Sequence, residues 1–588
     1  MNVAVTGSGI VSAIGLDKRQ VLESLMNGRT GIGPMQYLQS AHRELPVGEV
    51  KLTDDQMKQR LGIDTDKVVS RTALMGMLAI SQAVQEAGIG KRQGKRIVLI
   101  SGTTVGGMDV TERCFLDGTL LDNPDSIVNH DCGNNTRLMA SHFGIFDDVT
   151  TISTACSSAA NAIMLGVRLI KAGEADVVVA GGTEALSLFH LNGFNSLMIL
   201  DHEQCRPFDA TRAGLNLGEG AAYVVLESRQ QAIERNVAVQ AYVTGYGNAC
   251  DAFHQTASSE NGEGAYRAMT EALEMAHLQP ADVHYVNAHG TGTPNNDQSE
   301  SAALRRVFAQ NMPPVSSTKS FTGHTTSASG SIEIVICLLA MQHGFIPASL
   351  GCSTADPACI TPTAGLTGVK IEHVLCNSFG FGGNDSALVL SAHPTCPDTG
   401  EEPLLPADAV KEVARVEITS ADDLAEIKHY VKPLEARRMG KLMKSSLLAS
   451  LKAMEQAGID MPDAIITGTA YGCIENSERL LEQLAAEGET ALKPTYFMQS
   501  THNTIGSNIA IRTHCHGYNI TYTQEAHSLE WALRDASLLL RSGRCKTVLV
   551  GCHDESAPSF TRLMHSVGLP CPDDVKSTAI VLTVSCGE

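Results

Sequence analysis

The chain reads TACSSAA over residues 154–160, directly after the β-like run DVTTI at 148–152. A helical pattern follows and ends at Gly173. At this joint Cys156 is predicted to be the first helical residue, with its sulfur near the positive end of the helix dipole. That position favours the thiolate over the thiol, and the thiolate is the nucleophile. Cys156 is therefore the first candidate catalytic residue.

Strand-like runs alternate with helical patterns along most of the chain. Examples are RIVLI at 96–100, ADVVVA at 175–180 and AAYVVL at 221–226. Continuous apolar strands between helices indicate an α/β fold whose sheets are covered on both faces. Residues 393–409, HPTCPDTGEEPLLPADA, interrupt the alternation and are rich in proline and acidic residues. We interpret them as a linker, after which residues 410–588 resume the α/β pattern.

Composition is typical of a globular protein and excludes several classes. The 588 residues suffice for about two to four domains, and 43% of them are apolar. No apolar run reaches membrane-spanning length, and the N-terminus reads as a strand rather than a secretory leader. The net charge of −20 argues against nucleic acid as a partner. The sixteen cysteines form no CxxC pair, which indicates reduced thiols in a cytoplasmic protein rather than disulfides or a metal site.

The C-terminal region echoes the first half of the chain. ISGTTVGG at 100–107 matches ITGTAYGC at 466–473, and KAGEADVVVAGGTE at 171–184 matches RSGRCKTVLVGCHDE from Arg541 onward. The second match has an offset of 370 residues, which places Ala526 where the first half has Cys156. We therefore expect a partial repeat of the catalytic half without its nucleophile. Chance similarity between two α/β segments is the alternative.

Two histidines are candidate companions of the cysteine. A lone cysteine is more often a small buried hydrophobe than a catalyst, so companions decide its role. His289 follows a strand-like run in the Gly/Thr-rich turn NAHGTGT, which cannot be core helix. His324 ends the motif STKSFTGH, again in a loop of small residues.

Further residues form a supporting set. Lys319 lies five positions before His324, and Glu333 stands near the head of the apolar helix SIEIVICLLAMQ. A charged residue there is either a cap or a buried partner for the lysine. The loop NSFGFGG holds Phe379, Gly380 and Phe381, and its glycines let the backbone approach a ligand closely.

In this order, the four motifs resemble those of the β-ketoacyl-acyl carrier protein synthases, the elongating ketosynthases of the thiolase superfamily. The resemblance covers about residues 1–392. It implies a thiolase-like five-layer αβαβα fold made of two similar halves, normally in a homodimer. The expected division is an N-terminal half at 1–230 with Cys156, a C-terminal half at 231–392 with His289 and His324, a linker at 393–409, and an extra C-terminal α/β half-domain at 410–588 without the nucleophile.

The resemblance also implies a ping-pong reaction. Cys156 would accept an acyl chain from acyl carrier protein. His289 and His324 would bind the malonyl thioester of a second carrier protein, promote loss of CO₂ and steady the enolate that attacks the Cys156 thioester. The partners expected are therefore acyl- and malonyl-loaded carrier proteins. Because decarboxylation drives the reaction, no metal and no redox cofactor is expected.

Supporting roles follow from the same resemblance. Lys319 and Glu333 would form an ion pair. Backbone N–H groups of Cys156 and Phe381 would build the oxyanion hole, and Phe381 resembles the family's gating phenylalanine. Lys67 and Arg71, in a region that resembles a basic segment of the family, are candidate contacts for an acidic carrier protein.

The sequence departs from the family pattern near the expected acyl pocket. Leu215 stands where the family commonly has Phe, the polar run 325–330 follows His324, and Asn384-Asp385 replaces the usual Thr-Asn after the phenylalanine loop. These differences bear on the length and type of the acyl chain rather than on the reaction.

The C-terminal half-domain (residues 410–588) widens the range of functions. Its stretch at 494–523 resembles the ketosynthase-like half-domains found beside polyene-type ketosynthases. A non-catalytic packing or docking role is expected, or one similar to a chain-length factor. Aryl polyene or related polyketide chains are favoured over housekeeping fatty acids. The alternatives are a non-condensing acyltransferase or decarboxylase of the same superfamily, and a non-catalytic scaffold for a partner synthase.

Overall fold

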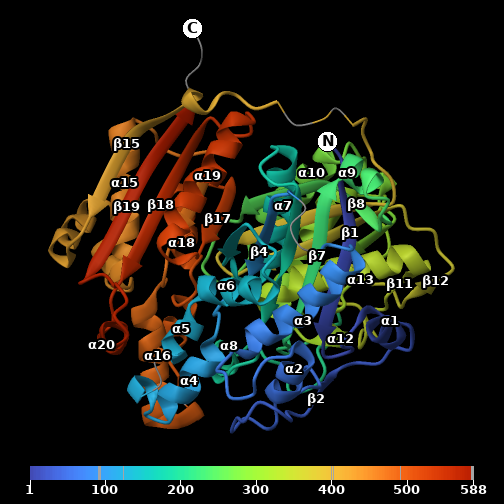
Figure 1. Cartoon of the computed structure of the whole chain (residues 1–588), viewed down its shortest axis with the longest axis horizontal. Coiled ribbons are helices and arrows are strands. Elements are labelled where there is room, and N and C mark those ends of the chain that lie inside the picture. Colours follow the sequence, from blue (N-terminus) through green and yellow to red (C-terminus); the bar gives the residue numbers. More distant parts are fainter. Residues whose placement is uncertain (91–93, 123–124, 399, 401–402, 491, 585–588) are drawn as a thin grey trace.

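One large mixed sheet runs through the molecule (Figure 1). The computed structural model describes residues 1–90, 94–122, 125–398, 400, 403–490 and 492–584. In these ranges fifteen strands pair in the order β10-β9-β13-β14-β8-β1-β7-β6-β4-β5-β17-β16-β18-β19-β15. Their bounds are β1 Val3–Ser12, β4 Ile97–Gly102, β5 Asp148–Ile152, β6 Val177–Glu184, β7 Gly220–Ser228, β8 Ala241–Cys250, β9 Tyr285–Asn287, β10 Val315–Ser316, β13 His373–Gly380, β14 Asn384–Ser391, β15 Val410–Ile418, β16 Ala464–Gly468, β17 Tyr518–Tyr522, β18 Thr547–Glu555 and β19 Val575–Val584.

Helices cover both faces of this sheet. They are α1 Lys18–Met26, α2 Asp54–Leu61, α3 Arg71–Glu86, α4 Met108–Leu116, α5 Asp125–His130, α6 Cys132–Phe143, α7 Ser158–Lys171, α8 Leu188–Ser196, α9 Arg229–Glu234, α10 Glu263–Met275, α11 Pro294–Phe308, α12 Lys319–Thr322, α13 Ser329–His343, α14 Pro433–Ala436, α15 Lys441–Ala457, α16 Ile474–Glu487, α17 Pro494–Met498, α18 Thr504–Thr513, α19 Ser528–Arg541 and α20 Pro558–Ser566. Two small hairpin sheets pair β2 (Ile32–Gly33) with β3 (Val47–Gly48) and β11 (Phe345–Ile346) with β12 (Leu366–Thr367). None of the helices in the described ranges combines the length and the apolar character that a membrane crossing needs.

The layers follow the expected order in the first two halves. Helix α3 packs on β1, β6 and β7 from outside, while α7 packs on β4 and β6 from the opposite side. Helix α13 packs beside α7 and against β13, and α10 closes the outer face of β8 and β14. This sequence of layers confirms the predicted thiolase-like arrangement. Three residue pairs between β1 and β8 also join the two half-sheets edge to edge.

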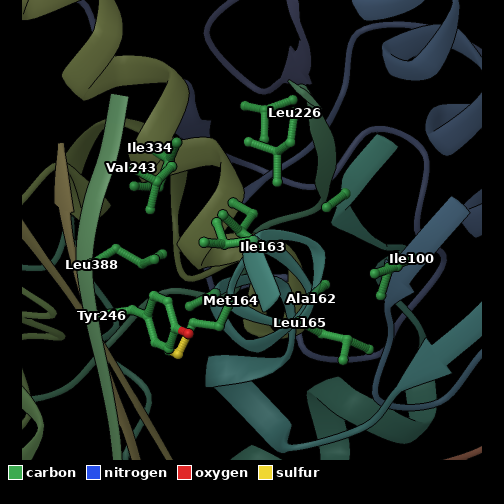
Figure 2. Packing of buried hydrophobic residues seen from close by; sticks show 14 of the residues in the cluster. Ile100, Ala162, Ile163, Met164, Leu165, Leu226, Val243, Tyr246, Ile334 and Leu388 are labelled. Atoms are coloured by element: carbon green, nitrogen blue, oxygen red, sulfur yellow. The ribbon is translucent and has the colours of Figure 1, made fainter. Parts of the chain in front are cut away.

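Helix α7 forms the centre of the core. Every residue from Ser158 to Ile170 is buried. In Figure 2, Ile163 and Met164 of α7 lie among apolar side chains of both halves, with Leu226 and Leu388 belonging to strands of different halves. A helix buried on every side is stable only when it has partners all around. Because Cys156 lies two residues before α7, the buried helix also fixes the position of the nucleophile candidate.

The C-terminal half-domain repeats the first half element by element, which confirms the predicted repeat. Moving β5 and α7 by 370 residues gives β17 and α19 with the same bounds. The hydrogen bonds repeat as well: Thr103 Oγ1 donates to Glu184 over 2.9 Å, and Thr469 Oγ1 donates to Asp554 over 2.8 Å. Ala526 lies in the short turn at 525–527, the counterpart of the turn at 155–157 that holds the cysteine.

The two homologous halves meet at equivalent strands. Strand β17 pairs antiparallel with the edge of β5, with Tyr522 opposite Ile152. Ser153 N donates to Thr521 O over 2.9 Å, and Thr523 N donates to Thr151 O over 3.0 Å. Each of these residues lies 370 positions from its counterpart, so a local two-fold axis passes between the strands. The half-domain thus completes its sheet on the first half and needs no further edge partner there.

A buried ion pair crosses this junction. Arg168 of α7 lies 2.8 Å from Asp535 of α19, and their side chains are 6% and 0% exposed. Tyr518 OH donates to the same carboxylate over 2.9 Å, and the guanidinium lies 4.7 Å from the Tyr518 ring centre. Each charge therefore relies on the other to offset the free energy lost when it is removed from water.

The predicted role of Arg71 in meeting a carrier protein is wrong. Its buried guanidinium donates to both carboxylate oxygens of Glu219 and, over 2.8 Å, to Asp54. A group so enclosed has no free donor face for another protein.

Replacing Asp535 by Ala should cost about 3–5 kcal/mol of unfolding free energy, because it leaves the Arg168 charge buried without a partner. Chemical denaturation followed by circular dichroism measures the change. The matched control is Glu412→Ala, which removes the partner of Arg415 in an ion pair whose two side chains are each 42% exposed. That control should cost less than about 1 kcal/mol. Equal losses in the two variants would contradict the assignment.

Replacing His553 by Thr, the residue found 370 positions earlier, should reduce acid sensitivity. His553 is fully buried, neither of its ring nitrogens has a hydrogen-bond partner among the described residues, and burial lowers its pKa to about 3. Below about pH 6.5 the unfolded chain binds a proton that the folded chain refuses, so stability falls as pH falls, by about 1.4 kcal/mol per pH unit. Between pH 8 and pH 5 the variant should therefore lose about 2 kcal/mol less than the wild type. The control is the exposed His527→Thr, whose pH dependence should match the wild type.

Candidate active site

The predicted nucleophile lies in a tight turn between β5 and α7. Residues Ala155–Ser157 form a single 3₁₀ turn, so Cys156 lies two residues before the first residue of α7 rather than beginning the helix. Ala155 has a φ of 50°, a left-handed conformation that is uncommon for a residue with a side chain. The Ser158 hydroxyl accepts from Thr154 N over 2.9 Å and donates to Ala155 O over 2.6 Å. These bonds hold the turn in its strained form.

Cys156 rests as a thiol, contrary to the expectation drawn from the helix dipole. The residue is 5% exposed, and burial raises its pKa to about 12. The nearby charge of Lys319 and the backbone N–H groups of Phe381 and Cys156 itself lower the pKa, but less than burial raises it. The field of one helix end is worth about 1 kcal/mol, too little to offset full desolvation of a charge. A base must therefore take the proton when the sulfur reacts.

His324 is placed to be that base. Its Nε2 lies 3.0 Å from the Cys156 sulfur, and its Nδ1 lies 3.0 Å from the Ser329 hydroxyl. Its backbone N–H donates to Asn216 O over 2.7 Å, which fixes the loop. His324 is therefore held by contacts at both ring nitrogens and by its backbone N–H.

His289 faces the same space from another loop. Its ring centre lies 5.3 Å from that of His324, with the two planes nearly perpendicular at 85°. The backbone N–H groups of His289 and Gly290 donate to the two carboxylate oxygens of Glu300, over 2.8 and 2.7 Å. Glu300 thus anchors the turn, while Nδ1 of the His289 ring is buried and has no hydrogen-bond partner in the part of the chain that the structure describes.

A buried ion pair lies beneath the two imidazoles. Lys319 Nζ approaches Glu333 to 2.5 Å, with side chains 2% and 3% exposed. Burial raises the pKa of Glu333 to about 7, although the lysine charge lowers it. Burial and the same lysine charge lower the pKa of both His289 and His324 well below 6.5. Both rings are therefore neutral across the physiological pH range.

The phenylalanine loop closes the site from the end of β13. Ser378 Oγ donates to Cys156 O over 3.4 Å. A Cβ on Gly380 would lie 2.8 Å from Thr154 O, so only glycine lets this strand end approach the cysteine turn. Phe379 packs 5.7 Å from the His289 ring. The sequence motif thus brings all three of its predicted residues, Phe379, Gly380 and Phe381, to the site.

A cavity of about 340 Å³ opens onto these residues. Its reactive end contains Cys156, His289 and His324. Apolar side chains line another part, namely Phe194, Leu197, Ile199, Leu215, Phe379 and Phe381. Leu215, one of the departures from the family pattern, therefore contacts the cavity, whereas residues 325–330 are not among those lining it. Lys319 and Glu333 also lie outside the lining and act on the site through their charges.

Sequence reasoning missed the contributions of the C-terminal half-domain. Asn503 Nδ2 donates to Phe381 O over 2.8 Å, and Phe497 packs against Phe194 with ring centres 5.2 Å apart. Both belong to the stretch at 494–523, whose resemblance gave no hint of contact with the cavity. The missing information was the pairing of β17 with β5, which brings this stretch to the site.

Comparison with known proteins agrees with the site. Family models for the beta-ketoacyl synthase N-terminal domain match residues 1–232 and again 411–583, and the C-terminal domain model matches residues 240–353. Nodulation protein E of Rhizobium meliloti is 34% identical over 405 residues, covering 66% of this chain and 98% of the relative. A 3-oxoacyl-[acyl-carrier-protein] synthase 2 of Synechocystis is 34% identical over 410 residues, with the same coverage of 66% and 98%.

Solved structures extend the likeness. The ishigamide ketosynthase/chain length factor is 30% identical with a TM-score of 0.61, covering 67% of this chain and 99% of its own. The PfaC keto synthase-chain length factor covers all of this chain and 79% of its own, with a TM-score of 0.78; at 17% identity it shows the shared fold alone. With the matched domains and the cysteine–histidine cavity together, the chain belongs to the β-ketoacyl synthase family and is a ketosynthase, an acyltransferase-type enzyme of fatty-acid- or polyketide-like chain elongation.

Proposed function

We propose that Cys156 carries the acyl group and that His289 and His324 act on a malonyl group delivered by acyl carrier protein. The observation that carries this proposal is the 3.0 Å approach of His324 Nε2 to the Cys156 sulfur, in a cavity that His289 also lines. The relative described as a 3-oxoacyl-[acyl-carrier-protein] synthase 2 supports the carrier protein as partner.

In the first half-reaction the thiol must lose its proton. When His324 Nδ1 donates to the Ser329 hydroxyl, Nε2 is free to accept the proton of Cys156. The sulfur then bonds to the acyl carbon, the bond from that carbon to the carrier's sulfur breaks, and the proton passes from His324 to the leaving carrier thiolate. No net charge accumulates in the buried site.

In the second half-reaction the malonyl unit loses CO₂ and becomes an enolate. Its carbon bonds to the acyl carbon, the carbon–sulfur bond to Cys156 breaks, and the released Cys156 thiolate takes up one proton from solvent, which restores the resting thiol. For this step His324 carries its proton on Nε2, and the Ser329 hydroxyl turns to donate to Nδ1. The neutral rings of His289 and His324 then supply N–H donors to the thioester oxygen where negative charge develops. Lys319 supports this role because its charge helps to keep both rings neutral.

The remaining predicted roles fit the same scheme. The backbone N–H groups of Cys156 and Phe381, which already act on the sulfur, are proposed to stabilise the oxyanion at the acyl carbon. Phe381 is proposed as the gate between carrier and cavity. Glu333 is proposed to hold Lys319 in place through their 2.5 Å contact.

The apolar part of the cavity favours condensation over the two alternatives. Phe194, Ile199 and Leu215 offer an acyl chain a dry lining next to Cys156. A decarboxylase that does not condense needs no such room, and a scaffold needs neither the room nor the histidines. Polyene or related polyketide chains remain our preferred products, supported by the additional half-domain.

We further propose that the C-terminal half-domain takes the place of a second subunit at β5. The division into 1–230, 231–392, the linker 393–409 and 410–588 is part of this proposal. The likeness to a ketosynthase/chain length factor supports pairing of a ketosynthase with a ketosynthase-like partner. The homodimer expected from the resemblance remains a prediction with one restriction: two copies cannot pair through the β5 edge, because β17 already does. A cytoplasmic location also remains a prediction.

Cys156→Ala should abolish acyl loading from an acyl carrier protein, followed as a mass increase of the intact protein. His289→Ala should still load the acyl group but should lower the condensation rate by about 10²–10³-fold, the usual cost of one oxyanion donor. Cys337→Ala, a buried cysteine outside the cavity, is the control and should load like the wild type. Acyl mass on Cys156→Ala would refute the assignment of the nucleophile.

Removing residues 393–588 should expose the β5 edge and leave Arg168 without its partner. We expect loss of soluble protein, or self-association through the bare edge, because an unpaired strand is a template for further pairing. Light scattering after size-exclusion chromatography measures the mass. A truncated chain with wild-type yield and the same number of copies per particle would contradict the proposed partner role.

A further inference from the structure

The C-terminal half-domain reaches the active-site loop first through a buried amide. Asn503 is fully buried, and its Nδ2 donates to Phe381 O over 2.8 Å. Asn503 stands at the N-cap of α18, yet its side chain makes no capping bond to that helix. Its donor is therefore directed at another segment of the chain, 122 residues away, instead of at its own helix.

Neighbouring contacts hold the same loop. Gly382 has a φ of 84°, and a Cβ there would lie 2.1 Å from Ser507 Oγ of α18. Gly382 N donates to Gln255 O over 2.7 Å. The loop is thus held between α18 on one side and Gln255 on the other.

An aromatic chain makes a third connection. Phe497 of α17 packs edge-on against Phe194, with ring centres 5.2 Å apart, and Phe194 stacks on Phe381 at 5.6 Å. A Cβ on Gly193 would lie 2.1 Å from the Phe497 ring, so the glycine makes room for it. The half-domain therefore supports both the backbone and the ring of Phe381.

The two polar groups of Phe381 have different partners. Its N–H acts on the Cys156 sulfur, while its carbonyl accepts from Asn503. We propose that Asn503 is a positioning residue that aims the Phe381 N–H at the acyl carbon, so that the C-terminal half-domain completes the oxyanion hole within one chain. This inference rests on the proposed function of Cys156. A donor contributes fully only at about 3 Å from the developing oxyanion, so a small displacement weakens it.

The first half offers no equivalent of this amide. The residue 370 positions before Asn503 is Gly133, and a Cβ there would lie 2.9 Å from Thr523 O. The packing at the junction therefore requires glycine at position 133 but accepts asparagine at the equivalent position 503. Of these two positions, the one with the amide is the one that contacts the Phe381 loop.

The test compares Asn503→Ala and the isosteric Asn503→Asp with Asn508→Ala. Asn508 lies on the same helix, is also buried, and its Nδ2 has no hydrogen-bond partner among the described residues. Single-turnover acylation of Cys156 by acyl carrier protein is followed by intact mass over a range of carrier concentrations. Melting temperatures are recorded in parallel.

Both Asn503 variants should lower the saturating acylation rate by about 10-fold or more, with the half-saturating carrier concentration within about twofold of wild type. Asn508→Ala should stay within about twofold on both measures. Wild-type acylation by the Asn503 variants, or an equal loss in Asn508→Ala at equal melting temperature, would overturn the inference. Wild-type protein that fails to acylate Cys156 would instead refute the proposed function. If Asn503→Ala does not fold, Asn503→Asp decides alone.

Discussion

Two reciprocal backbone hydrogen bonds, between Ser153 and Thr521 and between Thr523 and Thr151, constrain the rest of the molecule. They lie at the end of β5, three residues before Cys156, so the junction of the halves and the reactive turn are one rigid piece. Helix α7 follows the reactive turn into the core, and β17 extends the sheet beyond β5. The same pairing places α18 beside the phenylalanine loop. A ketosynthase whose partner belongs to the same chain keeps this geometry at any protein concentration, because the association is intramolecular.

The reaction chamber is almost free of net charge at rest. Cys156 is a thiol, and His289 and His324 are neutral. The buried ammonium of Lys319, whose charge acts on all three groups, is matched by Glu333. Such a chamber suits a reaction in which negative charge appears first on a sulfur and then on an enolate, because fixed N–H donors act strongly where water is excluded. Burial raises the cost of forming a thiolate, and in the proposed mechanism the adjacent imidazole of His324 offsets that cost by accepting the proton.

The sequence was informative wherever chemistry is local. Cys156, His289 and His324 each stand in a short motif whose neighbours are small, and the offset of 370 residues revealed the repeat without any structure. Properties that depend on tertiary packing could not be predicted from local motifs. The thiol state of Cys156 depends on its burial, and the ion pairs of Arg71 depend on Glu219, 148 residues away. Asn503 reaches the carbonyl of Phe381 only because β17 pairs with β5. The order of strands across β1 and β8 is likewise a tertiary result.

The turn at 525–527 has a meaning of its own. Glu525 has a φ of 49°, almost that of Ala155, although Ala526 carries no sulfur. A strained backbone beside a reactive residue is commonly interpreted as energy stored for catalysis. Here the same strain is present at the equivalent turn of the C-terminal half-domain, which has no cysteine there and acts as an internal control. The left-handed residue is therefore a requirement of the strand-to-helix turn itself and not of catalysis. The reactive cysteine uses a backbone geometry that the fold adopts with or without it.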